Sequence, residues 1–142
     1  LFAFVGAIFD MVDGALARRA GLVSKRGAFL DSTADRVSES ALLLGLLVYF
    51  LAPATADRTA AVLTFVGFAG SVMVSYVRAR AEGLGLGGAT RFEGLFTRSE
   101  RVAVVVIGLA VGQPVIVVWI LAVGTPLSAL QRFWSIWRSS GD

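Results

Sequence analysis

Four carboxylates within 26 residues of largely apolar sequence constrain this chain more than any other feature. They belong to Asp10, Asp13, Asp31 and Asp35. A charged carboxylate costs roughly 2.5–3.5 kcal/mol at the centre of a membrane-spanning helix, so four of them together need a positive partner. Because the chain contains neither histidine nor cysteine, a hard cation that prefers oxygen ligands is the natural partner.

The spacing of these acids predicts two helices that each carry one carboxylate pair. Asp10 and Asp13 are three residues apart, and Asp31 and Asp35 are four apart, so each pair shares one helix face. Two such faces can hold one or two divalent ions. The alternative interpretation is a set of solvated charges that cap two helices.

Small residues lie beside the acids and leave room for a ligand. Gly14, Ala17 and Gly27 keep the backbone bare, which favours the close approach of a bulky phosphate group. Arg18 follows Gly14 by one helical turn and is placed to face the negative charge of such a ligand.

The composition is that of a membrane protein. Hydrophobic residues make up 56% of the 142 residues and charged residues 16%, against about 45–50% and about 25% in soluble domains. Zero cysteines exclude disulfides and thiolate metal sites. The apolar segment 1–9 is shorter than the roughly 20 residues that a spanning helix needs, so we expect the chain to lack its N-terminal helices.

The hydrophobic pattern predicts an all-α transmembrane bundle that forms a single domain over residues 1–142. Five helices or parts of helices are expected here, and six in the complete protein. Their predicted bounds are Leu1–Arg19, Gly27–Leu51, Asp57–Ala81, Arg98–Val111 and Val115–Trp137. The glycine-rich segment Glu82–Thr97 is expected to be a loop rather than a nucleotide-binding motif, because no strand precedes it.

The basic residues predict the orientation of the bundle. All but one of the 13 basic residues fall on one side if the helices alternate in direction, and Arg58 is the exception. The positive-inside rule makes that side cytoplasmic. The acid pairs lie near the same membrane face, so we expect a multi-pass protein of the cell membrane whose site faces the cytoplasm.

A second set of charges is expected at helix ends on the acidic side. Three of them, Arg80, Arg101 and Arg132, fall inside helical ends, where buried charge is usually functional. We expect these arginines to bind an anion such as phosphate. For Arg91 and Arg138, cytoplasmic charge without a ligand is the simpler interpretation.

The chain resembles the CDP-alcohol phosphatidyltransferases, a family of membrane enzymes. All eight fixed positions of the family signature match, in the order Asp10-x2-Asp13-Gly14-x2-Ala17-Arg18-x8-Gly27-x3-Asp31-x3-Asp35. The resemblance implies transfer of a phosphatidyl group from a CDP-linked lipid to an alcohol, with release of CMP. It further implies that the four aspartates hold Mg²⁺ or Mn²⁺, as two ions, and that Asp35 is the catalytic general base. The CDP portion would be seated by Gly14, Ala17, Arg18, Ser24 and Gly27.

Further positions are similar to the actinobacterial phosphatidylinositol-phosphate synthases. The resemblance implies that they bind the phosphate of the acceptor inositol phosphate, and they are Ser75, Arg78, Arg80, Arg98, Arg101 and Arg132. Arg78 falls where a lysine is common in that group, which keeps the charge. The implied partners are CDP-diacylglycerol, inositol phosphate, membrane lipids and a second copy of the chain, but no nucleic acid.

Several alternatives stay open. Glycerol 3-phosphate is the nearest rival acceptor, and an archaeal-type ether lipid is a rival donor. A divalent-cation transporter would use the acids but not the glycine and arginine frame, and a non-catalytic assembly subunit would tolerate Asp35→Asn. Gly45, Gly67 and Ser71 are candidate dimer contacts. Gly67 and Gly70 suit packing within the bundle at least as well as they suit contact with a ligand.

Overall fold

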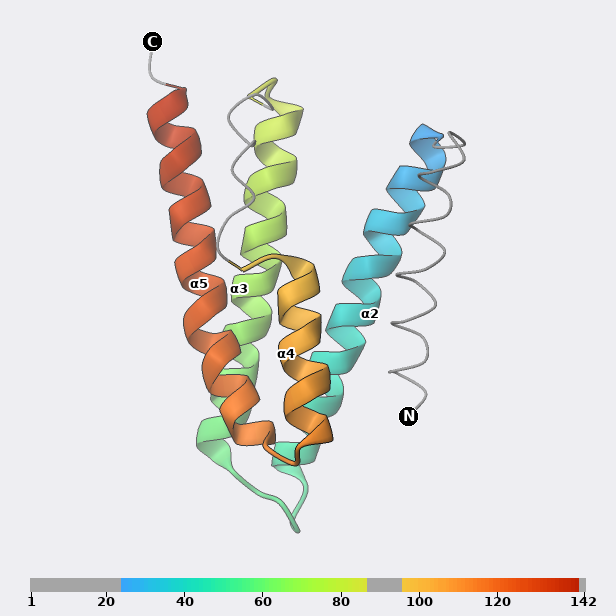
Figure 1. The fold of residues 1–142 in the computed structure, drawn as a ribbon, viewed down its shortest axis with the longest axis vertical. Helices are drawn as coiled ribbons and strands as arrows, with labels where there is room; N and C mark the ends of the chain where they lie inside the picture. The colour runs from blue at the N-terminus through green and yellow to red at the C-terminus, as the bar shows by residue number, and fades with distance from the viewer. Residues whose placement is uncertain (1–23, 87–95, 141–142) are drawn as a thin grey trace. The chain divides into compact units, whose positions relative to one another are not determined.

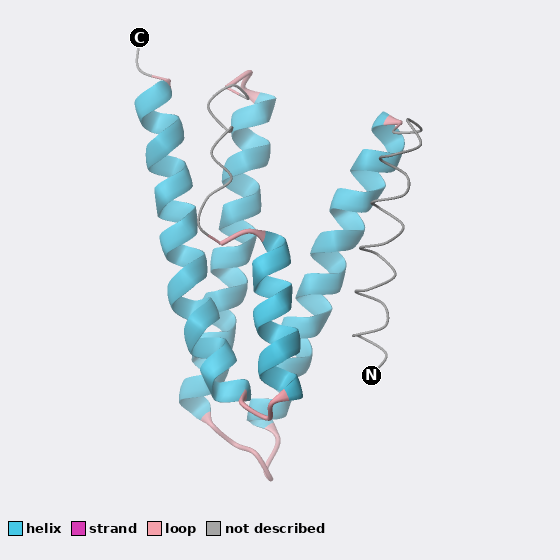
Figure 2. Cartoon of the chain, viewed as in Figure 1, coloured by secondary structure: helices cyan, strands magenta, loops and turns pink. Residues whose placement is uncertain are grey.

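The computed structural model describes residues 24–86 and 96–140, and most of these residues lie in helices (Figures 1 and 2). The helices are α2 (Lys25–Leu51), α3 (Arg58–Gly83), α4 (Arg98–Ala110) and α5 (Pro114–Ser139). The predicted first helix over residues 1–19 lies outside the described residues. The other four predicted helices are confirmed, and each end agrees with the prediction to within two residues.

Local signals account for where α2 and α3 begin and end. The N–H of Gly27 donates to the Ser24 hydroxyl at 3.0 Å, so Ser24 caps the start of α2. The helix ends at Leu51, two residues before Pro53. Asp57 then caps α3, because its carboxylate accepts from the N–H of Ala60 at 2.9 Å.

The turns around α4 and α5 follow the same rules. The N–H of Thr97 donates to the Glu100 carboxylate at 2.6 Å, which is half of a capping box. Gly112, with φ +70°, closes α4, and Pro114 occupies the first turn of α5. The 13 residues of α4 extend about 20 Å, which is too short to cross a membrane alone.

The chain divides into two compact units, residues 1–42 and 43–142, with the boundary inside α2. The first unit contains the acidic part of α2. The second unit contains the end of α2 together with α3, α4 and α5. In the second unit α5 packs along α3, the two helices run in the same direction, and α4 packs on α5 (Figure 1).

Small residues allow the helices of the second unit to approach closely. A Cβ atom at Gly70 would lie 2.8 Å from the Cβ of Thr125 and 2.9 Å from the backbone nitrogen of Pro126. A Cβ atom at Gly67 would lie 3.0 Å from the Cβ of Leu121. Such distances leave no room for a side chain, so both glycines serve packing between α3 and α5, as one of the two interpretations predicted.

Two of the described helices, α3 and α5, are long and apolar enough to cross a membrane. Large apolar side chains are exposed along both, which suits contact with lipid. They include Val62, Phe65, Met73, Ile116, Trp119, Leu127 and Leu130. The regular structure of the described residues is thus all helical and consistent with a fold of the membrane type, whereas the expected helix number is not confirmed.

The predicted dimer contacts need a correction. Gly67 and Ser71 are buried between helices of the same chain, so neither presents a surface to a second copy. Gly45 is exposed, and a Cβ atom there would meet nothing within 4 Å. Of the three, only Gly45 stays a candidate for such a contact.

Candidate active site

Two of the four predicted metal ligands lie on α2, one helical turn apart. Asp31 is exposed and Asp35 is half-buried. The helix is continuous across both positions, so the prediction that they share a face of one helix is confirmed. We call Asp31 and Asp35 the acidic face of α2. Asp10 and Asp13 lie outside the described residues.

The acidic face fits the chemistry expected of a divalent-ion site. Carboxylate oxygens are the ligands that Mg²⁺ and Mn²⁺ prefer, and two of them on successive turns can converge on one ion. Within residues 24–86 and 96–140, no group of three or more acidic side chains forms a complete ligand set. The second predicted pair, at positions 10 and 13, would add to these ligands and stays a prediction.

An ion pair that the sequence analysis missed follows the acidic face. Arg36 and Glu39 lie 3.3 Å apart on α2, and Glu39 is only 7% exposed. Glu39 stands one turn beyond Asp35, so it continues the row of carboxylates, but it is matched with a cation from its own helix. The spacing of three residues between opposite charges was a signal that could have revealed this pair.

Ser24 and Gly27, both predicted to contact the CDP portion of a lipid, contact each other. The Ser24 hydroxyl accepts from the N–H of Gly27, and a Cβ atom at Gly27 would lie 3.2 Å from that hydroxyl. Glycine at this position therefore leaves space for the cap. Gly14, Ala17 and Arg18, which complete the predicted lipid-binding set, lie outside the described residues.

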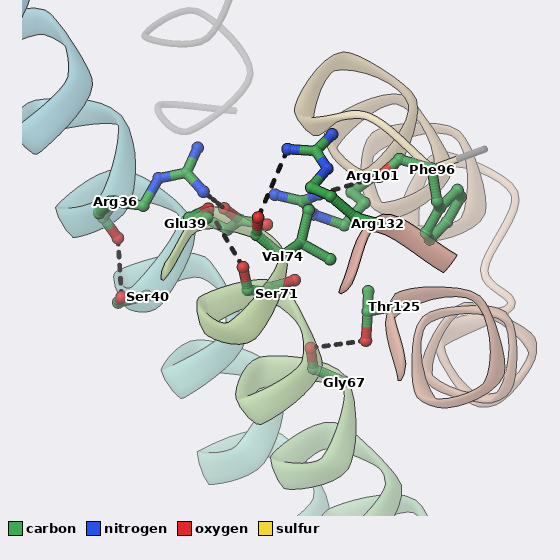
Figure 3. A network of polar contacts seen from close by, with 11 residues as sticks. Arg36, Glu39, Ser40, Gly67, Ser71, Val74, Phe96, Arg101, Thr125 and Arg132 are labelled. Atoms are coloured by element: carbon green, nitrogen blue, oxygen red, sulfur yellow. Dashed lines mark hydrogen bonds and ion pairs between the residues drawn. The ribbon is translucent and has the colours of Figure 1, made fainter. Parts of the chain in front are cut away.

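In the second unit, Arg101 occupies a closed environment at the start of α4. Its side chain is only 2% exposed, and its Nη1 donates to the carbonyl oxygen of Phe96 at 3.0 Å (Figure 3). A buried guanidinium keeps its charge, because arginine does not deprotonate in proteins. The prediction that Arg101 is a buried charge is confirmed.

Arg132 is the second buried arginine of this unit and links two helices. It lies on α5, is 7% exposed, and donates from Nη1 to the carbonyl oxygen of Val74 on α3 at 3.4 Å (Figure 3). Ser75, the next residue on α3, is half-buried and donates its hydroxyl proton to the carbonyl of Ser71 at 3.2 Å. We call Arg101 and Arg132 the buried arginines.

The side chains of the other arginines predicted to bind phosphate are more exposed to solvent than those of the buried arginines. Arg80 is exposed, which corrects the prediction that it is buried inside a helical end. The reason is that α3 continues to Gly83, and only Ala81 is buried in its last turn. Arg78 is exposed as well and pairs with Glu82 at 2.9 Å.

Arg98 and Arg138 lie on α4 and α5. Arg98, at the start of α4, is half-buried. Arg138 is exposed and lies 5.2 Å from the centre of the Trp134 ring, as an interfacial residue without a bound anion would. Arg91 lies outside the described residues.

The buried arginines can recognise a phosphate group. A guanidinium presents planar, directional donors that match phosphate oxygens, and burial fixes it where an exposed side chain would move. The acidic face of α2 can bind a cation. Each group, taken by itself, has chemistry that phosphoryl transfer uses, since metal ions and cationic side chains both bind phosphate oxygens.

A family model described as CDP-alcohol phosphatidyltransferase matches residues 1–130. The phosphatidylinositol phosphate synthase of Mycobacterium tuberculosis is 37% identical over 143 residues, covering 94% of this chain and 64% of that protein. The archaetidylinositol phosphate synthase of Pyrococcus horikoshii is 40% identical over 128 residues, covering 90% and 63% respectively. The chain thus spans just under two thirds of the length of these relatives.

Two crystal structures of the Mycobacterium tuberculosis enzyme share the fold at 34% identity. One has CDP-DAG bound, with a TM-score of 0.82 and coverage of 94% of this chain and 70% of that chain. The other is in complex with manganese and citrate, with a TM-score of 0.83 and coverage of 94% and 66%. The family match over most of the chain and these relatives agree with the signature read from the sequence, and the chain belongs to the CDP-alcohol phosphatidyltransferase family.

Proposed function

We propose that the protein is a membrane enzyme that transfers the phosphatidyl group of CDP-diacylglycerol to inositol phosphate. The products are phosphatidylinositol phosphate and CMP. One observation carries the choice of a phosphorylated acceptor, namely that two of the arginines predicted to bind its phosphate, Arg101 and Arg132, are buried rather than solvated. The name of the Mycobacterium tuberculosis relative supports inositol phosphate as this acceptor, and its structure with CDP-DAG bound supports the donor.

The acidic face supplies ligands for the metal in this proposal. Asp31 and Asp35, together with Asp10 and Asp13, hold two divalent ions, Mg²⁺ or Mn²⁺. A relative crystallised with manganese supports this set of ions. When bound, the ions supply positive charge against the diphosphate of the donor and the departing CMP.

Asp35 also acts as the general base. Its carboxylate accepts the proton of the acceptor hydroxyl, and the freed oxygen forms the new bond to phosphorus as the bond to CMP breaks. The half-buried position of Asp35 suits this task, since the carboxylate is partly shielded yet reachable. Gly14, Ala17, Arg18, Ser24 and Gly27 seat the CDP portion of the donor.

The arginines of the second unit orient the acceptor. Arg101 and Arg132 bind its phosphate as fixed donors, and four further residues complete the set: Ser75, Arg78, Arg80 and Arg98. A site that contains buried guanidiniums favours an acceptor that carries a phosphate, because the planar donors of arginine match phosphate oxygens.

Two alternatives of the same chemistry remain distinct proposals. Glycerol 3-phosphate also carries a phosphate, so the arginines alone do not separate it from inositol phosphate. The 40% identity to an archaetidylinositol phosphate synthase favours an ether lipid as a second donor class. A cation transporter, by contrast, has no need of an anion-binding group, so that function would not account for the buried arginines.

The site faces the cytoplasm in this proposal, because nearly all basic residues lie on its side of the membrane. The protein is multi-pass, with α3 and α5 among its spanning helices. It forms a homodimer in the membrane, where the exposed Gly45 offers a close-packing surface.

CMP release by the full-length protein tests the proposed reaction. The assay contains CDP-diacylglycerol and Mg²⁺, with inositol phosphate, glycerol 3-phosphate or no acceptor, and Asp35→Asn serves as the inactive control. We expect release with inositol phosphate alone. Release with glycerol 3-phosphate alone would keep the chemistry and overturn the acceptor, and replacing the donor by its ether analogue tests the lipid class.

A further inference from the structure

Two hydrogen bonds between α3 and α5 share one helical register. The hydroxyl of Thr125 donates to the carbonyl of Gly67 at 3.1 Å, and Arg132 donates to the carbonyl of Val74 at 3.4 Å (Figure 3). The partners are 58 residues apart in both cases. From the first bond to the second, each helix advances seven residues, or about two turns along the same face. The two contacts therefore depend on the same alignment of α5 on α3.

The Thr125 contact is a point of closest approach between the helices. Thr125 is 0% exposed, and its hydroxyl also lies 2.9 Å from the carbonyl oxygen of Leu121. Opposite, a Cβ atom on Gly70 would lie 2.9 Å from the backbone nitrogen of Pro126. Because backbone blocks that position, no larger residue fits without moving one helix away from the other.

The layer between the two contacts adds no directional bond. Ser71 on α3 and Ser128 on α5 are both buried there, and neither hydroxyl has a hydrogen-bond partner among the described residues. Their small side chains permit several alignments of the helices. The alignment of α5 on α3 at the level of Arg132 therefore depends on the close contact that involves Thr125 and Gly70.

We propose that Thr125 and Gly70 are positioning residues for Arg132. They fix α5 on α3 so that the guanidinium of Arg132 stands where it meets the phosphate of the acceptor. This inference rests on the proposed function, in which Arg132 binds that phosphate. A slip of one turn would displace the guanidinium by about 5.4 Å, and a misplacement of about 1 Å can already cost a hundredfold in rate.

Positioning and simple packing predict different kinetics. If Thr125 and Gly70 only hold the fold together, their substitution lowers the amount of folded enzyme, and the remaining molecules keep normal KM values. If they position Arg132, folded enzyme has a raised KM for the phosphorylated acceptor. The KM for CDP-diacylglycerol stays unchanged, because Arg132 binds the other substrate.

The test compares steady-state kinetics of four variants of the full-length protein. Thr125→Val keeps the volume and removes the hydroxyl, whereas Thr125→Ser keeps the hydroxyl. Gly70→Ala adds a methyl group at the close contact, and Gly83→Ala is the matched control at an exposed glycine of the same helix with open space around it. Each variant is assayed for kcat and for the KM of inositol phosphate and of CDP-diacylglycerol.

We expect the KM for inositol phosphate to rise about threefold in Thr125→Val. A change of that size corresponds to the free energy that one hydrogen bond between membrane helices typically contributes. In Gly70→Ala the rise should be about tenfold or more. Thr125→Ser and Gly83→Ala should stay near wild type. If Gly70→Ala does not fold, the two Thr125 variants decide the question alone.

The outcomes separate the inference from the function on which it rests. If wild type turns over inositol phosphate and Thr125→Val leaves its KM unchanged, or raises both KM values equally, the inference fails and the function stands. If wild type uses glycerol 3-phosphate instead, the KM of each variant relative to wild type is measured with glycerol 3-phosphate, and the same outcomes decide the inference. If wild type uses no phosphorylated acceptor, the proposed function fails and the inference falls with it.

Discussion

The acidic face of α2 and the buried arginines of the second unit differ in what determines the positions of their side chains. Asp31 is exposed and Asp35 half-buried, and only their own helix sets their spacing. Arg132 is 7% exposed and reaches across from α5 to a carbonyl of α3. Local spacing therefore creates the first group, whereas packing between helices creates the second.

This difference predicts how activity and stability respond to substitution. A carboxylate that faces outward contributes to catalysis through a ligand, so its loss leaves the fold intact. A buried guanidinium is part of the packed interior, so its loss affects both. Substitutions in the two regions should therefore separate into two classes.

The largest expected effect is on catalysis by Asp35. Asp35→Asn should lower acceptor-dependent CMP release by about 10²–10⁴-fold, because an amide cannot take the acceptor proton. The thermal unfolding midpoint in detergent should stay near that of wild type. Asp57→Asn makes the same chemical change at the N-cap of α3, where asparagine caps equally well, and this control should keep full activity. Retained acceptor-dependent release in Asp35→Asn would contradict the role of Asp35.

Arg101→Ala should reduce activity and stability together. The guanidinium is 2% exposed and donates to the carbonyl of Phe96, so its removal should lower the free energy of unfolding by about 2 kcal/mol. Chemical denaturation in detergent measures this loss. Arg58→Ala removes an exposed arginine as a control and should change neither property. An Arg101→Ala protein as stable as wild type would contradict the claim that the buried arginines, unlike the acidic face, contribute to stability.

Asp31→Asn should change the response to metal while leaving stability unchanged. Removal of divalent ions by EDTA should abolish CMP release in wild type, and Mg²⁺ or Mn²⁺ should restore it. The variant should need at least about tenfold more metal for half-maximal activity, since loss of a ligand weakens the site. The same metal requirement in the variant and in wild type would remove Asp31 from the ligand set.

The smallest expected effect is on stability, from substitution of Ser24. Two variants distinguish its role as the cap of α2 from a contact with the lipid donor. Ser24→Ala should destabilise α2 by about 1 kcal/mol, because the N–H of Gly27 loses its acceptor. Asn is also a good N-cap, so Ser24→Asn should restore stability. If Ser24 also contacts CDP, the KM for CDP-diacylglycerol stays raised in Ser24→Asn. A normal KM in that variant limits Ser24 to the cap.

The helices could be predicted because their ends carry local signals. Asp57 caps α3, Pro53 follows the end of α2, and Gly112 and Pro114 separate α4 from α5. The aspartate spacing was equally readable, since four residues always return to the same helix face. These features need no knowledge of the fold.

The depth of each arginine could not be predicted in the same way. Arg80 and Arg101 both fall near helix ends in the sequence, yet Arg80 is exposed and Arg101 is buried. The difference arises because α4 packs on α5, whereas the last turn of α3 extends beyond its packed part. The contact of Thr125 with Gly67 joins positions 58 residues apart, a separation that no local pattern encodes.

The preference for a phosphorylated acceptor tests the central claim most directly. The kcat/KM ratio for inositol phosphate over inositol is measured in wild type and in Arg132→Gln, with both proteins shown to be folded by their thermal unfolding. We expect wild type to prefer inositol phosphate by about 10²-fold or more, and the variant to lose most of that preference while its turnover of inositol is unchanged. An undiminished preference in Arg132→Gln would contradict the assignment of the buried arginines to the acceptor phosphate.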